Sequence, residues 1–394
     1  MINNNMLSRE RMLNAIRHQP VDHDPLYLRL WSMGKEVNNV PFPWQDQVVR
    51  AENLLRLGVD DTLLLEPPLG YTEQYHADQV PGVQSSLVRL PRADGDNYPL
   101  LQKVYQTPEG RLTQVVKVTP DWPHGEDIML FSDFNIARYH EPLIKGMEDI
   151  QRLKYLLADP SSEQVAEFHQ RSLGLHQEAQ RLGVALDGGW SALGDSVVWL
   201  CGMENVLYWQ MDQPKLLEAL LDVLLEWELM RLDMLLGEGI DDLVHMAWYE
   251  GTDFWTPKNY RRMLKPRIQQ IIDRVHSKRV PFRYIITKGW KPLGKDFLEM
   301  GIDCIMGVDP VQDNINLEEA KRELGDQICL MGGINAAVML TQWTDEEIRQ
   351  AVRHAIKILS PGGGFILYPV DNVSRDLPWE KVELVIEEWK DCQK

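Results

Sequence analysis

The chain has few cysteines. Among its 394 residues there are four, Cys201, Cys304, Cys329 and Cys392, and no two of them form a CxxC pair. Such wide spacing argues against a disulfide framework and against a structural zinc finger. Residues 1–14 are polar and charged and contain no hydrophobic signal segment, so we expect the protein to be cytoplasmic.

Long runs of basic or apolar residues are also absent. The chain carries 41 Lys and Arg against 59 Asp and Glu, a net charge of −18. Nucleic-acid binding needs clustered basic side chains, so we expect no nucleic-acid partner. No apolar stretch reaches the roughly 18 residues of a membrane span, so we expect no membrane insertion.

What the sequence does contain is a regular series of short apolar segments, most of them separated by helical patterns. Segments that are apolar without alternation are typical of parallel strands buried on both faces. A series of eight such units predicts an α/β fold, a (β/α)8 TIM barrel in a single domain of residues 1–394. The rival fold is a doubly wound open sheet, but no GxGxxG follows the first strand. The expected strands are residues 26–30, 62–66, 184–187, 242–248, 282–287, 304–308, 328–331 and 365–368.

Residues 67–145 interrupt this rhythm. Two alternating segments, residues 103–107 and 112–118, flank Pro108-Glu109-Gly110-Arg111, which is a hairpin signal. We therefore expect a β-hairpin-containing insertion near the mouth of the barrel, with too little apolar content to form a core of its own.

Several motifs resemble the uroporphyrinogen decarboxylase superfamily. They are RERMLNAIRHQPVD (residues 9–22) followed by Pro25, GMENVL (202–207), TPKNY (256–260), GGFIL (363–367) and DLPWEKV (376–382). The resemblance implies a (β/α)8 barrel and two chemistries. One branch of the superfamily decarboxylates uroporphyrinogen without a cofactor, and the other transfers methyl groups to or from corrinoid proteins.

Departures from the family patterns decide between these chemistries. The decarboxylases have an arginine-rich loop after the first strand, whereas residues 28–34 here contain only Arg29. The thiol-methylating enzymes bind zinc through a His-x-Cys and a later Cys, but the matching positions here read Ile286-Thr287-Lys288-Gly289 and Tyr368-Pro369-Val370-Asp371. The resemblance therefore predicts no zinc site. It favours a methyltransferase that moves a methyl group from a methoxylated, aromatic donor to the cobalt of a separate corrinoid protein.

Two alternatives stay open. One is a cofactor-independent decarboxylase with a less anionic substrate, and the other is a catalytically silent barrel that acts as a binding partner. A homodimer is a possible assembly. An N/O metal site of His245, Glu250 and Asp371 is a lesser alternative.

The candidate site residues follow the carboxyl ends of the expected strands, where parallel α/β folds place their chemistry. Each also has a structural interpretation, such as a cap, a buried ion pair or a packed ring. An aryl ether needs a flat apolar pocket and a proton donor or cation for the departing phenolate. The catalytic candidates are Asp371, Lys288, Glu250 and His245, and the substrate-binding candidates are Glu66, Asp187, Trp190, Trp248, Tyr368, Arg29 and Asp309.

Overall fold

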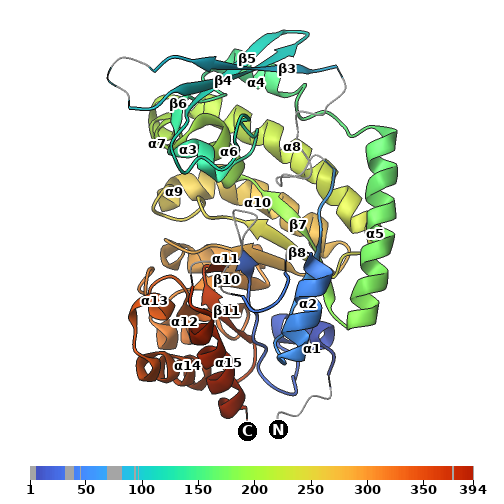
Figure 1. The fold of residues 1–394 in the computed structure, drawn as a ribbon, viewed down its shortest axis with the longest axis vertical. Helices are drawn as coiled ribbons and strands as arrows, with labels where there is room; N and C mark the ends of the chain where they lie inside the picture. The colour runs from blue at the N-terminus through green and yellow to red at the C-terminus, as the bar shows by residue number, and fades with distance from the viewer. Residues whose placement is uncertain are drawn as a thin grey trace.

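A curled parallel sheet forms the centre of the molecule (Figure 1). The computed structural model describes residues 6–31, 40–44, 46–68, 82–92, 95, 97–374 and 377–393. Within them the sheet has seven strands in the order β12-β11-β10-β9-β8-β7-β2, and every neighbouring pair is parallel. The strands are β2 (Thr62–Leu65), β7 (Ala185–Ala192), β8 (Asp242–Met246), β9 (Phe282–Ile285), β10 (Cys304–Val308), β11 (Cys329–Asn335) and β12 (Phe365–Val370). Seven of the eight expected strands are thus confirmed.

The eighth expected strand, residues 26–30, differs from the prediction. Leu26 pairs with Leu367 of β12, and Tyr27 pairs with Asp60 just before β2, each as an isolated parallel bridge. The segment that follows, β1 (Leu30–Trp31), pairs with β13 (Val373–Ser374) in a separate two-stranded sheet. The same short segment therefore bonds to both edges of the seven-stranded sheet, but as bridges and not as a full strand.

Helices cover the outer face of the sheet (Figure 1). Helices α5, α8, α10, α12 and α14 contact sheet strands directly, so both faces of the strands are buried and their sequences are apolar without alternation. Helix α5 begins with a Ser161–Gln164 capping box and ends at Gly183, whose φ of +68° favours glycine. Outside the insertion, the described helices are α1 (Ser8–Ile16), α2 (Gln47–Arg56), α5 (Ser162–Leu182), α6 (Gly194–Cys201), α7 (Met203–Asp212), α8 (Pro214–Glu238), α9 (Pro257–Asn259), α10 (Lys265–His276), α11 (Gly294–Met300), α12 (Leu317–Leu324), α13 (Met339–Gln342), α14 (Asp345–Leu359) and α15 (Trp379–Cys392). Two short turns, the π-helical η2 (Tyr260–Leu264) and the 3-10 η3 (Lys291–Leu293), accompany them.

Helix α1 closes the amino-terminal end of the curled sheet. The Arg9 amide donates to the carbonyl of Gly183, which precedes β7, at 2.8 Å. The Ser8 hydroxyl lies 3.4 Å from the carbonyl oxygen of Asp61, which precedes β2. On its inner side the helix contributes Met12, Ala15 and Ile16 to the apolar cluster of the concave face. The opposite, carboxyl-terminal end carries the candidates Trp190, Trp248 and Asp371.

A second sheet is built by the predicted insertion. It is antiparallel, in the order β3-β4-β5-β6, and lies at the top of Figure 1. The expected hairpin is confirmed as β4 and β5, which pair from Leu100↔Lys117 to Thr107↔Gly110. Residues 69–81, 93, 94 and 96 of the insertion lie outside the described residues, as do Asp376 of the last family motif and residues 32–34 of the loop after Arg29. The elements here are β3 (Gln84–Leu90), β4 (Leu100–Thr107), β5 (Gly110–Lys117), β6 (Tyr139–Glu141), α3 (Asp133–Ile136) and α4 (Met147–Leu153).

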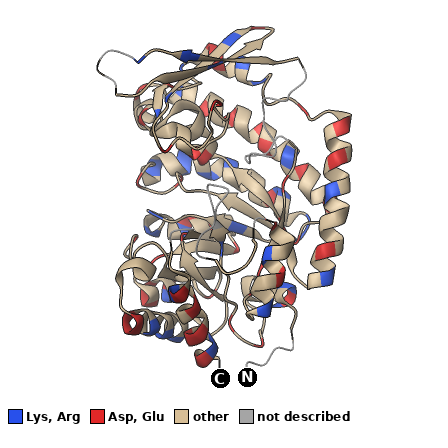
Figure 2. Ribbon diagram, viewed as in Figure 1, with Lys and Arg blue, Asp and Glu red and all other residues tan. Residues whose placement is uncertain are grey.

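Charged residues of both signs are distributed over the helices rather than gathered by sign (Figure 2). Among the described helices, none is both long enough and apolar enough to cross a membrane.

Candidate active site

Five candidate residues meet at the carboxyl-terminal end of the curled sheet. Trp190 lies on β7, Trp248 follows β8, Tyr368 lies on β12, Asp371 follows β12, and Arg29 precedes β1. The Arg29 guanidinium carbon lies 4.6 Å from the ring centroid of Trp190 and 5.7 Å from that of Trp248. These five residues, here called the mouth cluster, come from four segments that are far apart in the sequence.

The mouth cluster contains buried polar atoms that lack hydrogen-bond partners. They are Arg29 Nη1, Trp248 Nε1 and Asp371 Oδ1. The Tyr368 hydroxyl is within hydrogen-bonding reach of the Arg29 side chain. Buried polar groups in folded proteins are nearly always paired with protein or with ordered water, so these atoms are open to a partner such as water or a ligand. The half-buried indoles of Trp190 and Trp248 add flat apolar surface.

Burial changes the proton affinity of the cluster. It raises the pKa of the Asp371 carboxyl; the Arg29 charge opposes this rise, and the carboxylates of Asp309 and Asp133 reinforce it. Burial also raises the pKa of Tyr368 well above its usual value. Asp371 is therefore disposed to keep its proton and Tyr368 to remain a neutral phenol.

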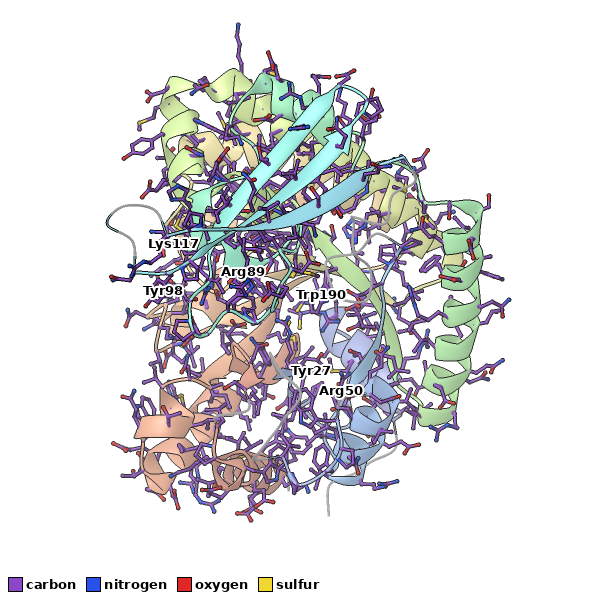
Figure 3. The ribbon with its side chains drawn as sticks, turned by 45° about the horizontal axis from the view of Figure 1, so that its top comes forward. Tyr27, Arg50, Arg89, Tyr98, Lys117 and Trp190 are labelled. Atoms are coloured by element: carbon purple, nitrogen blue, oxygen red, sulfur yellow. The ribbon has the colours of Figure 1, made fainter. Side chains whose placement is uncertain are left out.

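Below the mouth cluster the concave face is closed by rings and then by an ionic layer. The rings of Tyr27 and Tyr368 are 6.1 Å apart, and the Arg283 guanidinium lies 5.9 Å from the Tyr27 ring. Figure 3 draws Tyr27 and Trp190 beneath the insertion sheet, in the middle of the molecule. Arg283 forms ion pairs with Asp187 and with Asp242, the latter at 2.7 Å. The candidate Asp187, which also accepts from the Thr62 hydroxyl at 2.7 Å, thus lies in this interior layer.

Lys288 follows β9 and Asp309 follows β10, both at the carboxyl-terminal end of the sheet. Asp309 accepts hydrogen bonds from the Asn335 side-chain amide at 2.7 Å and from the Val311 main-chain amide at 2.8 Å. Burial raises the pKa of Asp309, and the charge of Lys288 opposes that rise. The Lys288 side chain is exposed, so it acts on Asp309 through its charge and not through a direct contact.

His245 and Glu250 belong to a buried network on the helix side of the sheet. The Glu250 carboxylate accepts from the Tyr284 hydroxyl at 2.5 Å and from the Gly194 amide at 2.7 Å. His245 Nε2 lies 3.3 Å from the same carboxylate, and its Nδ1 lies 2.9 Å from the Ser191 hydroxyl. The Tyr284 ring packs against Phe297 of α11. The structure thus places these two candidates apart from the mouth cluster.

Glu66 follows β2 and lies beside α5. Its main-chain carbonyl accepts a hydrogen bond from the Arg171 guanidinium. Burial lowers the pKa of that arginine, and the Glu66 charge opposes the fall.

The sequence reasoning missed Asp133. This residue begins α3 in the insertion, and its carboxylate accepts from the Tyr249 hydroxyl at 2.6 Å and from the Trp199 indole at 3.2 Å. Its charge reaches Asp371. The only local signal is Ser132, which caps α3 through the Phe134 amide at 3.2 Å, and a helix cap does not reveal where the helix docks.

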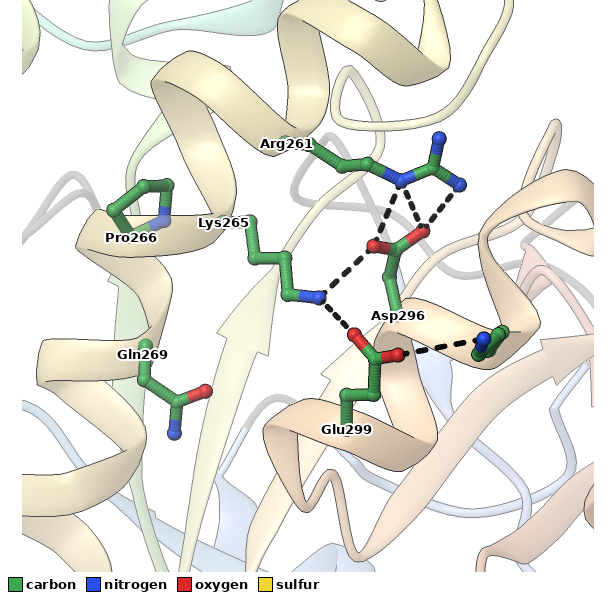
Figure 4. A pocket seen from close by; sticks show the side chains of 7 residues that line it. Arg261, Lys265, Pro266, Gln269, Asp296 and Glu299 are labelled. Carbon is green, nitrogen blue, oxygen red and sulfur yellow. Dashed lines mark hydrogen bonds and ion pairs between the residues drawn. The ribbon is translucent and has the colours of Figure 1, made fainter.

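A groove of about 650 Å³ lies elsewhere, between α10 and α11 (Figure 4). Its charged walls are paired with each other: Lys265 contacts Asp296 at 3.0 Å and Glu299 at 2.6 Å, and Arg261 contacts Asp296 at 2.9 Å. Because these charges are mutually compensated, the groove offers less than the mouth cluster to a ligand. The described residues contain no group of three or more His, Cys, Asp and Glu side chains placed to hold a metal ion.

Comparison with known proteins decides the family. The family model described as uroporphyrinogen decarboxylase (URO-D) matches residues 129–392, about two thirds of the chain. The chain belongs to the uroporphyrinogen decarboxylase family. The resemblance read from the sequence motifs is thereby confirmed.

One curated relative and one solved structure resemble the chain. A uroporphyrinogen decarboxylase from Thioalkalivibrio sulfidiphilus (strain HL-EbGR7) is 28% identical over 190 residues, which are 47% of this chain and 51% of that protein. The match thus spans about half the length of that relative. A solved structure of a methyltransferase from Methanosarcina mazei has a TM-score of 0.59 and 15% identity, and the match covers 98% of this chain and 99% of that one. At this identity the second likeness establishes a shared fold.

Proposed function

We propose that this family member is a corrinoid-dependent methyltransferase, which takes a methyl group from a methoxylated, aromatic donor and passes it to a separate corrinoid protein. The observation that carries the proposal is the mouth cluster: polar atoms without partners lie beside two indole faces and a carboxyl group with a raised pKa. The likeness in fold to the Methanosarcina mazei methyltransferase supports it. We further propose that residues 25–31 close the sheet into an eight-stranded barrel.

Each residue of the cluster has a task in this proposal. The donor's ring lies against the indoles of Trp190 and Trp248, which supply apolar contact area. Asp371, protonated before reaction, points its proton at the ether oxygen. As the methyl C–O bond breaks, the oxygen keeps the bonding electron pair and takes that proton, so the product leaves as a neutral phenol. The partner's reduced corrinoid, when docked, supplies the electron pair that accepts the methyl group.

The proposal assigns the carboxyl-terminal end of the sheet to the partner. A donor bound between Trp190 and Trp248 has its methyl group directed out of the sheet, where a docked corrinoid meets it. The cytoplasmic location and the absence of a bound zinc ion remain predictions of the proposal. A homodimer remains the predicted assembly, to be read from the mass of the protein in solution.

The decisive experiment mixes the protein with a reduced corrinoid carrier and a panel of methoxylated aromatics, with methylamines as control donors. We expect methylation of the carrier, followed by its absorption spectrum, to require both the protein and an aryl ether. Asp371→Asn should lower the rate by about a hundredfold or more, whereas Arg322→Ala, an exposed site on α12, should leave it unchanged. No methylation from any donor, with a carrier shown to be competent, would overturn the proposal.

A cofactor-independent decarboxylase is the second candidate, favoured by the match to the Thioalkalivibrio sulfidiphilus enzyme. A carboxylate on Arg29 and a proton from Asp371 onto the carbanion left by departing carbon dioxide would use the same cluster. Release of carbon dioxide from an aromatic or pyrrolic acid, without any corrinoid present, is the result that would favour it.

A further inference from the structure

Arg29 differs from the other buried arginines that the structure describes. Arg11 pairs with Asp22 and Asp60, Arg231 pairs with Glu228, and Arg283 pairs with Asp187 and Asp242. Arg29 is also buried, with 8% of its surface exposed. Within the described part of the chain it nevertheless forms no ion pair, and its Nη1 has no hydrogen-bond partner. A buried charge is normally paired, because moving a charged group out of water costs free energy unless an opposite charge compensates it.

The surroundings of Arg29 hold the guanidinium but do not neutralise it. The Trp190 and Trp248 rings attract the cation through their faces, but a ring face accepts no hydrogen bond in the guanidinium plane. Trp248 Nε1 also lacks a partner, so a further donor lies in the same cluster. Donors without acceptors fit a ligand that supplies acceptor atoms and negative charge.

Asp371 does not fill this role. It lies near enough for its charge to act on that of Arg29, but it forms no ion pair with it, and its Oδ1 is also without a partner. Burial and the neighbouring Asp309 and Asp133 charges raise the pKa of Asp371, which favours its neutral form beside the guanidinium.

We propose that the site takes an aromatic carboxylate, whose carboxylate group accepts hydrogen bonds from Arg29 while its ring lies against Trp190 and Trp248. For methyl transfer, which rests on the proposed function, the donor is then a methoxybenzoate-type acid rather than a neutral aryl ether. Binding of the carboxylate itself requires no methyl transfer. Arg29 is a specificity-determining residue, and Asp371 is left to act on the ether oxygen.

The test measures binding without any corrinoid. Quenching of tryptophan fluorescence, checked by calorimetry, gives the affinity of the complete protein for 4-methoxybenzoate, for the neutral 4-methoxybenzamide and for benzoate. We expect both acids to bind roughly ten- to a hundredfold more tightly than the amide, since a charge-assisted pair is exchanged for a neutral contact. In Arg29→Met this preference should disappear, and in Arg29→Lys, which keeps the charge but loses the planar fork, it should be reduced. Arg322→Met is the control for the loss of one arginine from the chain.

The outcomes separate this proposal from the proposed function. Equal affinity of the unaltered protein for acid and amide would overturn the carboxylate site. So would an Arg29→Lys variant, shown to be folded by its circular dichroism, that retains the full preference while losing turnover, because Arg29 would then act on the departing oxygen. A clear preference for the acids, together with no methylation of any carrier, would keep the carboxylate site and reject the methyltransferase.

Discussion

The Asp187 carboxylate and the Arg283 guanidinium form an ion pair inside the curled sheet, from β7 and β9, two strands with β8 between them. Both side chains are almost completely buried. Arg283 also pairs with Asp242 at 2.7 Å, and burial raises the pKa of Asp242 well above its usual range. The pair forms a polar floor beneath the mouth cluster.

We predict that Asp187→Asn destabilises the protein by about 3–5 kcal/mol, because it removes one of the two carboxylates paired with a buried guanidinium. The exposed Arg322–Glu323 pair provides the matched control, and Glu323→Gln should change the free energy of unfolding by less than about 1 kcal/mol. Urea denaturation followed by circular dichroism measures both. Unchanged stability with a large loss of ligand binding would return Asp187 to the binding site.

The order of strands and helices along the chain was predictable from sequence, because each βα unit has a local sequence pattern. Short apolar segments with glycines or prolines at their ends located β2, β10 and β12 to within two residues. The face of the sheet from which each side chain projects was not predictable. In the strand Asp242–Met246 all five residues are buried, so no polar alternation indicates that Val244 packs on the concave face and His245 on the helix side. His245 stays a predicted site residue, which the structure places in the buried network of Glu250 and Ser191.

The mouth cluster was predictable in part. The rule that chemistry follows the carboxyl ends of parallel strands found Trp190, Trp248, Tyr368 and Asp371. It also selected Glu250, whose side chain turns back under Gly194, because the rule gives the position of a residue but not the direction of its side chain. Asp133 reaches the cluster only through the docking of α3, a tertiary relationship that no local pattern encodes.

The Glu250 network gives the second prediction. Glu250→Ala removes the acceptor of the Tyr284 hydroxyl and of the Gly194 amide, and each buried donor left unpaired costs about 1–3 kcal/mol. We expect a loss of at least 2 kcal/mol in stability, with kcat/KM of the folded fraction within a few-fold of the unaltered protein. Lys288→Ala, at an exposed position, should leave stability within about 0.5 kcal/mol. A stable Glu250→Ala variant without activity would restore a catalytic role for Glu250.

The third prediction concerns α1, where one arginine is buried and another exposed. Arg11 contacts Asp22 at 2.7 Å and Asp60 at 2.5 Å, whereas Arg9 is half-exposed beside Asp241. Arg11→Met should cost about 3–5 kcal/mol, and Arg9→Met about 1 kcal/mol or less. Thermal or urea unfolding of the two variants makes the comparison, and equal effects would contradict it.

The same contact gives a pH dependence. Burial acts to raise the pKa of Asp22, but hydrogen bonds from Arg11 and from the Met6 amide outweigh it. They hold the pKa of Asp22 at about 2, below its ordinary value of 3.8. A carboxyl group with a depressed pKa stabilises the folded state above its unfolded pKa and ceases to do so as the pH falls through its folded pKa. The stability difference between the unaltered protein and Asp22→Asn should therefore be full above about pH 4 and shrink toward pH 2. A difference that stays constant down to pH 2 would contradict this assignment.

The last prediction tests the proton on Asp371 through a residue that does not touch the donor. If protonated Asp371 is the acid, the rate of methyl transfer falls as the pH rises through its raised pKa, because the ionised form has no proton to give. The Asp133 charge contributes to that rise, so Asp133→Asn should move the fall in kcat to lower pH. Tyr249→Phe is the matched control, since it removes the hydroxyl that donates to Asp133 at 2.6 Å but keeps the Asp133 charge near Asp371. A pH profile of kcat in each variant makes the measurement. If Asp133→Asn lowers the rate equally at every pH, Asp133 only positions α3 and its charge does not set the pKa of the catalytic acid. A rate in the unaltered protein that does not fall as the pH rises would rule out Asp371 as that acid.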